Sequence, residues 1–228
     1  MAAYEIIKIG EKSWRFEENG VRSFLFEGEN AALLVDTGYG SGNIKEAAEG
    51  LTKLPIQLVI THADGDHISG NKYFEKARMH PAEFDRFHNG AGKGLTAEAL
   101  WENEIIDLGG RKFEVILIPG HTPGSIALLD RKNRILVAGD SIQAGMIFMA
   151  GGGRNIDAYI FSMKKIAAMA DLFDTVYPSH GPFPVNADIM PALITGAQNL
   201  KDGKLKGEAP PFETNAKVYD AGAAKFLF

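Results

Sequence analysis

Histidine and aspartate side chains follow the ends of several apolar segments in this sequence. Seven such side chains share this position: His62, Asp64, Asp66, His67, His121, Asp140 and His180. If the apolar segments are strands that end at one edge of a sheet, the seven side chains can converge, because ligands in such folds bind at strand ends. Imidazole and carboxylate groups are standard ligands of zinc, iron and manganese. The spacing therefore predicts a metal centre.

The number of candidate ligands predicts more than one metal ion. Seven ligands exceed one four-coordinate site, and they suit two adjacent ions that share a bridging carboxylate and a hydroxide. Two ions can clamp both the attacking and the leaving oxygen of a reaction and lower the pKa of a bound water. The sequence has no cysteine, so thiolate ligands, thiolate nucleophiles and disulfides are excluded.

The apolar segments predict the elements that position these ligands. Strands are expected at 21–26, 31–35, 56–60, 104–108, 112–118, 125–129, 135–138 and 175–177, with an edge strand at 217–219. Helices are expected at 43–54, 70–74, 81–88, 158–172 and 186–200. Gly109 and Gly110 predict a hairpin between two of the strands. The mixture indicates an α/β or α+β fold with a sheet that is not all parallel, and we expect a single domain over residues 1–228.

The composition narrows the function classes. Of the 228 residues, 23% are charged, and the formal net charge is -5. Because no block of Lys and Arg is present, we expect a small-molecule substrate and no nucleic-acid partner. The N-terminus lacks a secretory signal, and no segment is long enough to span a membrane, which predicts a cytoplasmic protein without membrane contact. The oligomeric state is left open.

Four short motifs occur in order along the chain. They are THADGDHISG at 61–70, GHTPGS at 120–125, AGDS at 138–141 and PSHGP at 178–182, preceded by LVDTG at 34–38. In this order they resemble the metallo-β-lactamase superfamily, over roughly residues 20 to 185. The resemblance implies the metallo-β-lactamase fold, a four-layer αββα sandwich.

The resemblance also implies roles for the seven candidate ligands. It places His62, Asp64 and His121 around a first metal ion, Asp66, His67 and His180 around a second, and Asp140 between the two. Asp66 is the candidate catalytic residue, because it could also orient the nucleophile or shuttle a proton. The expected reaction is attack of a metal-bound hydroxide on a small ester, thioester, lactone or related substrate.

Asp64 departs from the family pattern, which usually has a second histidine there. A carboxylate adds negative charge and favours harder metals, so we expect two divalent ions, zinc first, with iron or manganese as the alternative. The added charge would also reduce Lewis acidity and raise the pKa of the bound water. Asp is shorter than His, so the first site could be weak or empty.

Other functions stay open at this point. Diiron relatives that carry a carboxylate at this position suggest a redox enzyme acting on oxygen or nitric oxide. Nuclease activity is a third possible function, and the negative net charge of the chain argues against it. The last alternative is a metal-binding domain whose catalytic activity is weak or lost.

Three further residues outside the seven candidate ligands have expected roles. Arg154 follows a triple glycine and could bind an anionic part of a substrate or pair with a surface acid. Asp36 is expected to order its turn rather than to bind metal. His80 is expected to be a structural or surface histidine.

Overall fold

The computed structural model describes residues 3–228, which form two compact units. The first unit ends at Val115 and the second begins at Ile116, so the boundary falls within strand β9 (Lys112–Leu117). Among the described residues, no helix is long and apolar enough to cross a membrane. The expectation of a single domain stays a prediction.

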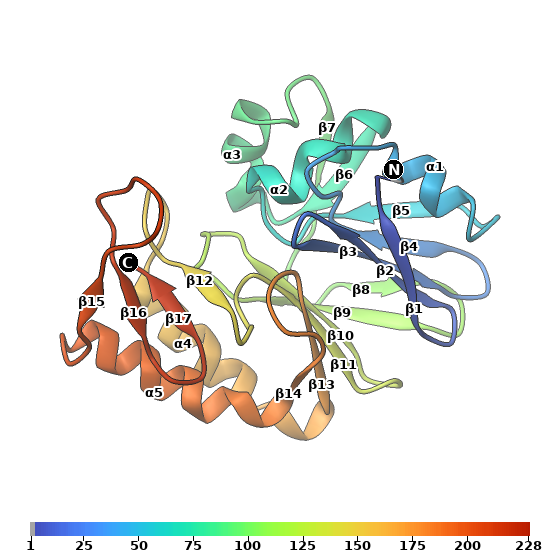
Figure 1. Cartoon of the computed structure of the whole chain (residues 1–228). Coiled ribbons are helices and arrows are strands. Elements are labelled where there is room, and N and C mark those ends of the chain that lie inside the picture. The colour runs from blue at the N-terminus through green and yellow to red at the C-terminus, as the bar shows by residue number, and fades with distance from the viewer. Residues whose placement is uncertain (1–2) are drawn as a thin grey trace. The chain divides into compact units, whose positions relative to one another are not determined.

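A seven-stranded sheet organises the first unit, and its strand order follows the chain (Figure 1). The strands are β1 (Glu5–Gly10), β2 (Ser13–Glu18), β3 (Val21–Glu27), β4 (Ala32–Val35), β5 (Ile56–Val59), β6 (Lys76–Met79) and β7 (Thr96–Ala99). Neighbours pair antiparallel from β1 to β4 and parallel from β4 to β7. Because β4, β5 and β6 run parallel, the segments that follow them begin at the same edge of the sheet.

Short helices connect these strands. They are α1 (Ile44–Glu49), α2 (Gly65–Ile68) and α3 (Phe84–Asn89), with 3-10 turns at η1 (Ser69–Tyr73) and η2 (Pro81–Glu83). Their apolar side chains join the strands in one buried core, to which Ile44, Ile68 and Phe87 belong. The helix predicted at 43–54 is shorter than expected: it ends at Glu49 with Gly50 as its C-cap, and glycine is unfavourable in a helix interior.

The hairpin predicted around Gly109 and Gly110 is confirmed. Strand β8 (Ile105–Asp107) pairs antiparallel with β9 across this turn. Both glycines have positive φ values of 79° and 70°, a conformation that glycine adopts without the steric cost of a Cβ.

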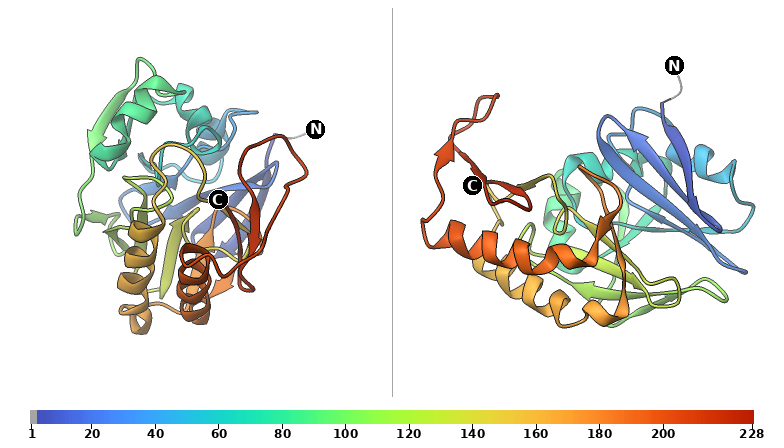
Figure 2. Two further views of the ribbon diagram at one scale, coloured as in Figure 1. Left: turned by 90° about the vertical axis from the view of Figure 1, so that its left-hand side faces the viewer. Right: turned by 60° about the horizontal axis from the view of Figure 1, so that its bottom comes forward.

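The second unit contains strands β10 (Ile126–Asp130), β11 (Ile135–Gly139), β13 (Thr175–Pro178) and β14 (Val185–Asn186). They lie in the order β14-β13-β11-β10, and β11 and β13 are parallel. Helices α4 (Ile156–Ala167) and α5 (Met190–Lys201) run side by side (Figures 1 and 2). Their buried faces share one apolar core with these strands. Two 3-10 turns, η3 (Ala170–Leu172) and η4 (Ala187–Ile189), precede β13 and α5.

A small sheet in the second unit was only partly predicted. Its strands are β12 (Met146–Phe148), β15 (Gly207–Glu208), β16 (Val218–Asp220) and β17 (Lys225–Leu227), in the order β12-β17-β16-β15. The strand expected at 217–219 is β16, but it lies between β15 and β17, so its assignment as an edge strand is wrong. Its neighbours are two and three residues long, too short to show an alternating pattern.

Candidate metal centre

Four of the predicted ligands come together in the first unit, in the loop after β5 and in α2. The rings of His62 and His67 lie with their centroids 4.0 Å apart. Nε2 of His62 lies 3.6 Å from Oδ2 of Asp64, and Nε2 of His67 lies 3.7 Å from Oδ2 of Asp66. Both histidines are buried. Each therefore has its Nε2 directed at a carboxylate that the same motif supplies.

Asp36 orients both of these histidines from the end of the neighbouring strand β4. Its Oδ2 accepts from the Thr61 hydroxyl at 2.7 Å and lies 2.9 Å from Nδ1 of His67. Its Oδ1 accepts from the backbone N–H of Thr61 at 2.7 Å. The Thr61 hydroxyl in turn lies 3.1 Å from Nδ1 of His62. The expected turn-ordering role of Asp36 thus extends to two candidate ligands.

Glu83, at the end of η2, also contacts the loop after β5 that carries His62 and Asp64. Its side chain is fully buried, and Oε2 accepts from the backbone N–H of Ala63 at 2.8 Å. Ala63 lies between the predicted ligands His62 and Asp64. This contact was not predicted from the sequence.

Replacing Glu83 by Ala should lower the free energy of unfolding by about 1–3 kcal/mol, because a buried N–H loses its acceptor. Glu83→Gln keeps an acceptor oxygen and should cost less. Urea unfolding of the two variants beside the parent protein measures the difference. An alanine variant as stable as the parent would show that this hydrogen bond does not hold the loop.

The second unit brings together its three predicted ligands around one carboxylate. Oδ2 of Asp140 lies 3.7 Å from Nε2 of His121 and 3.4 Å from Nε2 of His180. Asp140 and His180 follow β11 and β13, which are adjacent and parallel, so their ends meet at one edge. His121 comes from the loop after β9 and is fully buried.

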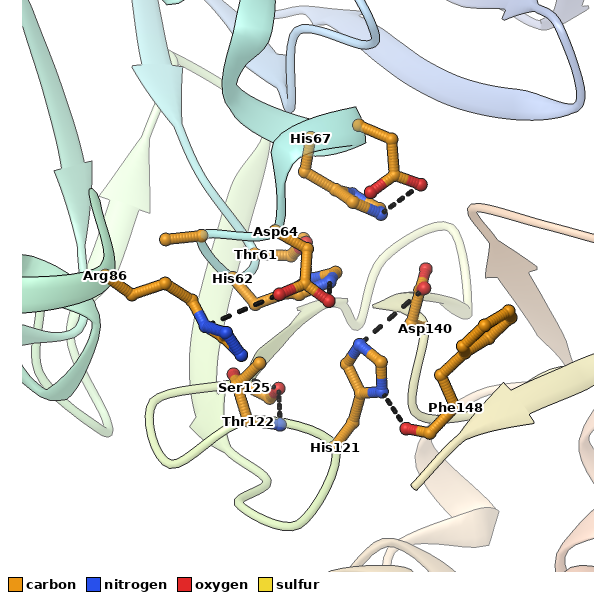
Figure 3. Close-up of polar contacts among 12 residues, drawn as sticks. Thr61, His62, Asp64, His67, Arg86, His121, Thr122, Ser125, Asp140 and Phe148 are labelled. Carbon is orange, nitrogen blue, oxygen red and sulfur yellow. Dashed lines mark hydrogen bonds and ion pairs between the residues drawn. The ribbon is translucent and has the colours of Figure 1, made fainter. Parts of the chain in front are cut away.

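The loop that carries His121 is fixed by its neighbours in the same unit. Nδ1 of His121 lies 2.7 Å from the carbonyl oxygen of Phe148 in β12 (Figure 3). Gly120 has a φ of +143°, and a Cβ there would meet the Tyr159 backbone at 2.4 Å, so a side chain does not fit. The Tyr159 hydroxyl donates to the Ser141 carbonyl at 2.9 Å, and burial raises the pKa of Tyr159, which keeps this donor protonated.

The donor set fits divalent metal ions. Nδ1 of His67 and of His121 faces an acceptor oxygen, a contact that places the proton on Nδ1 and leaves the Nε2 lone pair for a metal. The Nε2–carboxylate distances of 3.4–3.7 Å exceed those of hydrogen bonds. Two ligands about 2.1 Å from one ion at tetrahedral angles would lie about 3.4 Å apart.

Asp64 stands apart from the other predicted ligands. The described residues include groups of His and Asp side chains that could hold a metal ion, and these groups contain every predicted ligand except Asp64. Its Oδ1 lies 3.4 Å from Nε of Arg86 in α3 (Figure 3). Arg86 was not predicted as a site residue. Glu83 and Arg86 are three positions apart in the segment expected to be helical, so the sequence could place both on one side of it but could not show what that side contacts.

Arg154 and His80 lie outside these clusters. Arg154 is half-buried in the loop before α4, and the next residue, Asn155, donates its backbone N–H to the Gly120 carbonyl at 2.9 Å. A substrate contact for Arg154 stays a prediction. Burial lowers the pKa of His80, and its Nδ1 accepts from the backbone N–H of Ala82, in accord with a structural role.

Comparisons with known proteins identify the family. A family model described as the metallo-beta-lactamase superfamily matches residues 17–180. The acyl-coenzyme A thioesterase MBLAC2 of Gallus gallus is 27% identical over 207 residues, which cover 73% of this chain and 75% of that protein. A hydroxyacylglutathione hydrolase of Synechococcus sp. (strain JA-2-3B'a(2-13)) is 35% identical over 118 residues, which cover 50% of this chain and 45% of that protein.

Solved structures show the same fold. A metallo-beta-lactamase from Pontibacter korlensis gives a TM-score of 0.74 at 18% identity, over 86% of this chain and 99% of that one. The stereoselective inverting sec-alkylsulfatase Pisa1 from Pseudomonas sp. gives 0.72 at 14% identity, over 88% of this chain and 42% of that one. These likenesses confirm the predicted fold class, and the family match confirms the resemblance. The chain therefore belongs to the metallo-beta-lactamase superfamily, and it is a metallo-hydrolase of that superfamily.

Proposed function

We propose that this protein hydrolyses small acyl thioesters with two divalent metal ions bound by His62, Asp64, Asp66, His67, His121, Asp140 and His180. The observation that carries the proposal is the direction of the imidazoles. In each unit, the Nε2 atoms face carboxylate oxygens at the spacing of ligands on a shared ion. Zinc is the expected ion, because imidazole and carboxylate both suit it.

We assign the ligands to the two ions as the resemblance to the superfamily implies. His62, Asp64 and His121 are assigned to the first ion, Asp66, His67 and His180 to the second, and Asp140 to both. The bound ions would supply a Lewis acid for the carbonyl oxygen and a water activated at neutral pH. The chain's own part is to hold the imidazoles of His62, His67 and His121 in the Nδ1–H form, through Thr61, Asp36 and the Phe148 carbonyl respectively.

Thioesters are favoured over the other expected substrates for two reasons. One relative is named an acyl-coenzyme A thioesterase, and another is named a hydroxyacylglutathione hydrolase. A thiol has a pKa of about 8.5, so a thiolate leaves at neutral pH with little help from a general acid. Asp66 is partly exposed beside His67, and we assign it the role of the group that would take a proton from the attacking water.

The test is a substrate panel on freshly purified protein of measured metal content. We expect kcat/KM for an acyl thioester to exceed that for the matching oxygen ester by about tenfold or more, equivalent to about 1.4 kcal/mol in the barrier. Thiol release, followed with a chromogenic reagent, measures hydrolysis of the thioester. Release of the carboxylic acid measures hydrolysis of both the thioester and the oxygen ester. Faster cleavage of a lactone or a lactam would contradict the thioester assignment. Iron content with oxygen consumption would instead support the redox alternative.

The proposal also includes the kind of substrate, the cellular location and the role of Arg154. The substrate is taken to be a small molecule, and the cytoplasmic location stays a prediction from the sequence. Arg154 is proposed to contact an anionic part of the substrate, because it lies beside the loop that carries His121.

A further inference from the structure

The carboxylate of Asp64 lies between a predicted metal ligand and an arginine. Oδ2 is 3.6 Å from Nε2 of His62, and Oδ1 is 3.4 Å from Nε of Arg86. Asp64 occupies the N-cap position of α2, yet its side chain makes no capping hydrogen bond there. Its two oxygens thus face one neighbour each, Oδ2 toward His62 and Oδ1 toward Arg86.

Arg86 is held in place by the segment that carries it. Phe87, the next residue, is fully buried in the core of the first unit. Glu83, three positions earlier, accepts from the backbone N–H of Ala63. The segment η2–α3 thus contacts the ligand loop at two consecutive residues, through Glu83 at Ala63 and through Arg86 at Asp64.

The charges of this pair offset the departure from the family pattern. A histidine ligand is neutral, whereas Asp64 alone would add one negative charge beside His62. The guanidinium of an arginine carries one positive charge. The side chain of Asp64 is 19% exposed and that of Arg86 34%, so solvent only partly screens the pair. Asp64 and Arg86 together have no net charge, as a neutral histidine ligand would have.

We propose that Arg86 is a positioning residue that makes Asp64 usable as a metal ligand. Arg86 holds Oδ1, so that Oδ2 is presented beside Nε2 of His62, and it neutralises the charge that the carboxylate adds. Asp64 and Arg86 then act as one unit in place of a histidine. This inference rests on the proposed ligand set, in which Asp64 and His62 bind the same ion.

A double-mutant cycle on Asp64 and Arg86 tests this unit. The four proteins are the parent, Arg86→Gln, Asp64→His and the double variant. In the parent background, loss of Arg86 removes the partner of a ligating carboxylate, a change that typically lowers metal affinity by about 10–100-fold. In the Asp64→His background, the arginine has no carboxylate to orient and only repels the cation, so its loss should leave the affinity equal or raise it.

Zinc affinity and stoichiometry are the readouts, by competition with a chromogenic chelator and by elemental analysis. The cycle cancels the direct repulsion between Arg86 and the ion, which both backgrounds share. We expect Arg86→Gln to weaken binding of the more weakly bound zinc at least about tenfold more in the parent background than in the Asp64→His background, and a difference above about threefold in this direction supports the pair. A smaller difference overturns it. If Arg86→Gln does not fold, Arg86→Lys enters the same cycle, since lysine lacks the planar group that meets Oδ1.

Arg78→Gln is the matched control. Arg78 lies in the same unit, on β6, and forms an ion pair with Glu104 at 2.7 Å. Its loss should leave zinc binding unchanged in both backgrounds. Because the readout is metal binding, failure of the cycle and failure of thioester hydrolysis are separate results: a protein that cleaves no thioester can still show the coupling.

Discussion

Asp140→Asn is expected to reduce thioester hydrolysis by roughly 10³-fold, a loss equivalent to about 4 kcal/mol of transition-state stabilisation. One oxygen of Asp140 faces both His121 and His180, at 3.7 and 3.4 Å. An amide of the same shape has no negative charge and is a poor ligand, so a position assigned to both ions is weakened at once. Elemental analysis should show less than the parent metal content, and initial rates should show the loss of activity.

Asp130→Asn is the control for this substitution. Asp130 is buried like Asp140, with an exposed fraction of 0% against 6%, and it lies in the same unit, at the end of β10, where it accepts from the side chain of Asn133. Its replacement can lower stability but should leave metal content and turnover per metal at parent values. An Asp140→Asn protein that keeps both ions and its activity would remove Asp140 from the metal centre.

The candidate ligands could be predicted because their signal is local in sequence. His121, Asp140 and His180 each follow an apolar strand, and glycine or proline beside them marks a tight loop. The structure places these three around one carboxylate oxygen within the second unit. The strand ends therefore carried enough information to group Asp140 and His180, which are 40 positions apart, because the parallel strands β11 and β13 align their ends at one edge.

The partners of these ligands could not be predicted in the same way. The Phe148 carbonyl that faces His121 belongs to a three-residue strand whose pairing with β17 joins positions far apart in the chain. Arg86 and Glu83 lie in a segment correctly expected to be helical, but periodicity says which residues share a face and not what that face meets. Such contacts depend on tertiary packing, for which a single sequence has no local signal.

Asp36→Asn should lower metal affinity by about 10–100-fold, the cost typical of losing a partner that orients a ligating histidine. Asp36 has a φ of +61°, a conformation that asparagine tolerates better than alanine does, so the backbone should be preserved. The amide keeps an oxygen for the Thr61 N–H, but its NH₂ group replaces Oδ2 and faces the Nδ1–H of His67. Two donors then oppose each other.

His67 can relieve this conflict by moving its proton to Nε2, the atom that faces Asp66. The ring then accepts from the amide and can no longer bind a metal through Nε2. Asp36→Gly separates this effect from simple loss of a contact, because glycine also tolerates the positive φ but imposes no tautomer. We expect zinc affinity to fall further in Asp36→Asn than in Asp36→Gly, with ¹⁵N chemical shifts of the imidazoles reporting the proton on Nε2. Equal losses in the two variants would show that Asp36 acts by anchoring the ring and not by setting its tautomer, and parent-like zinc binding in both would show that neither role is needed.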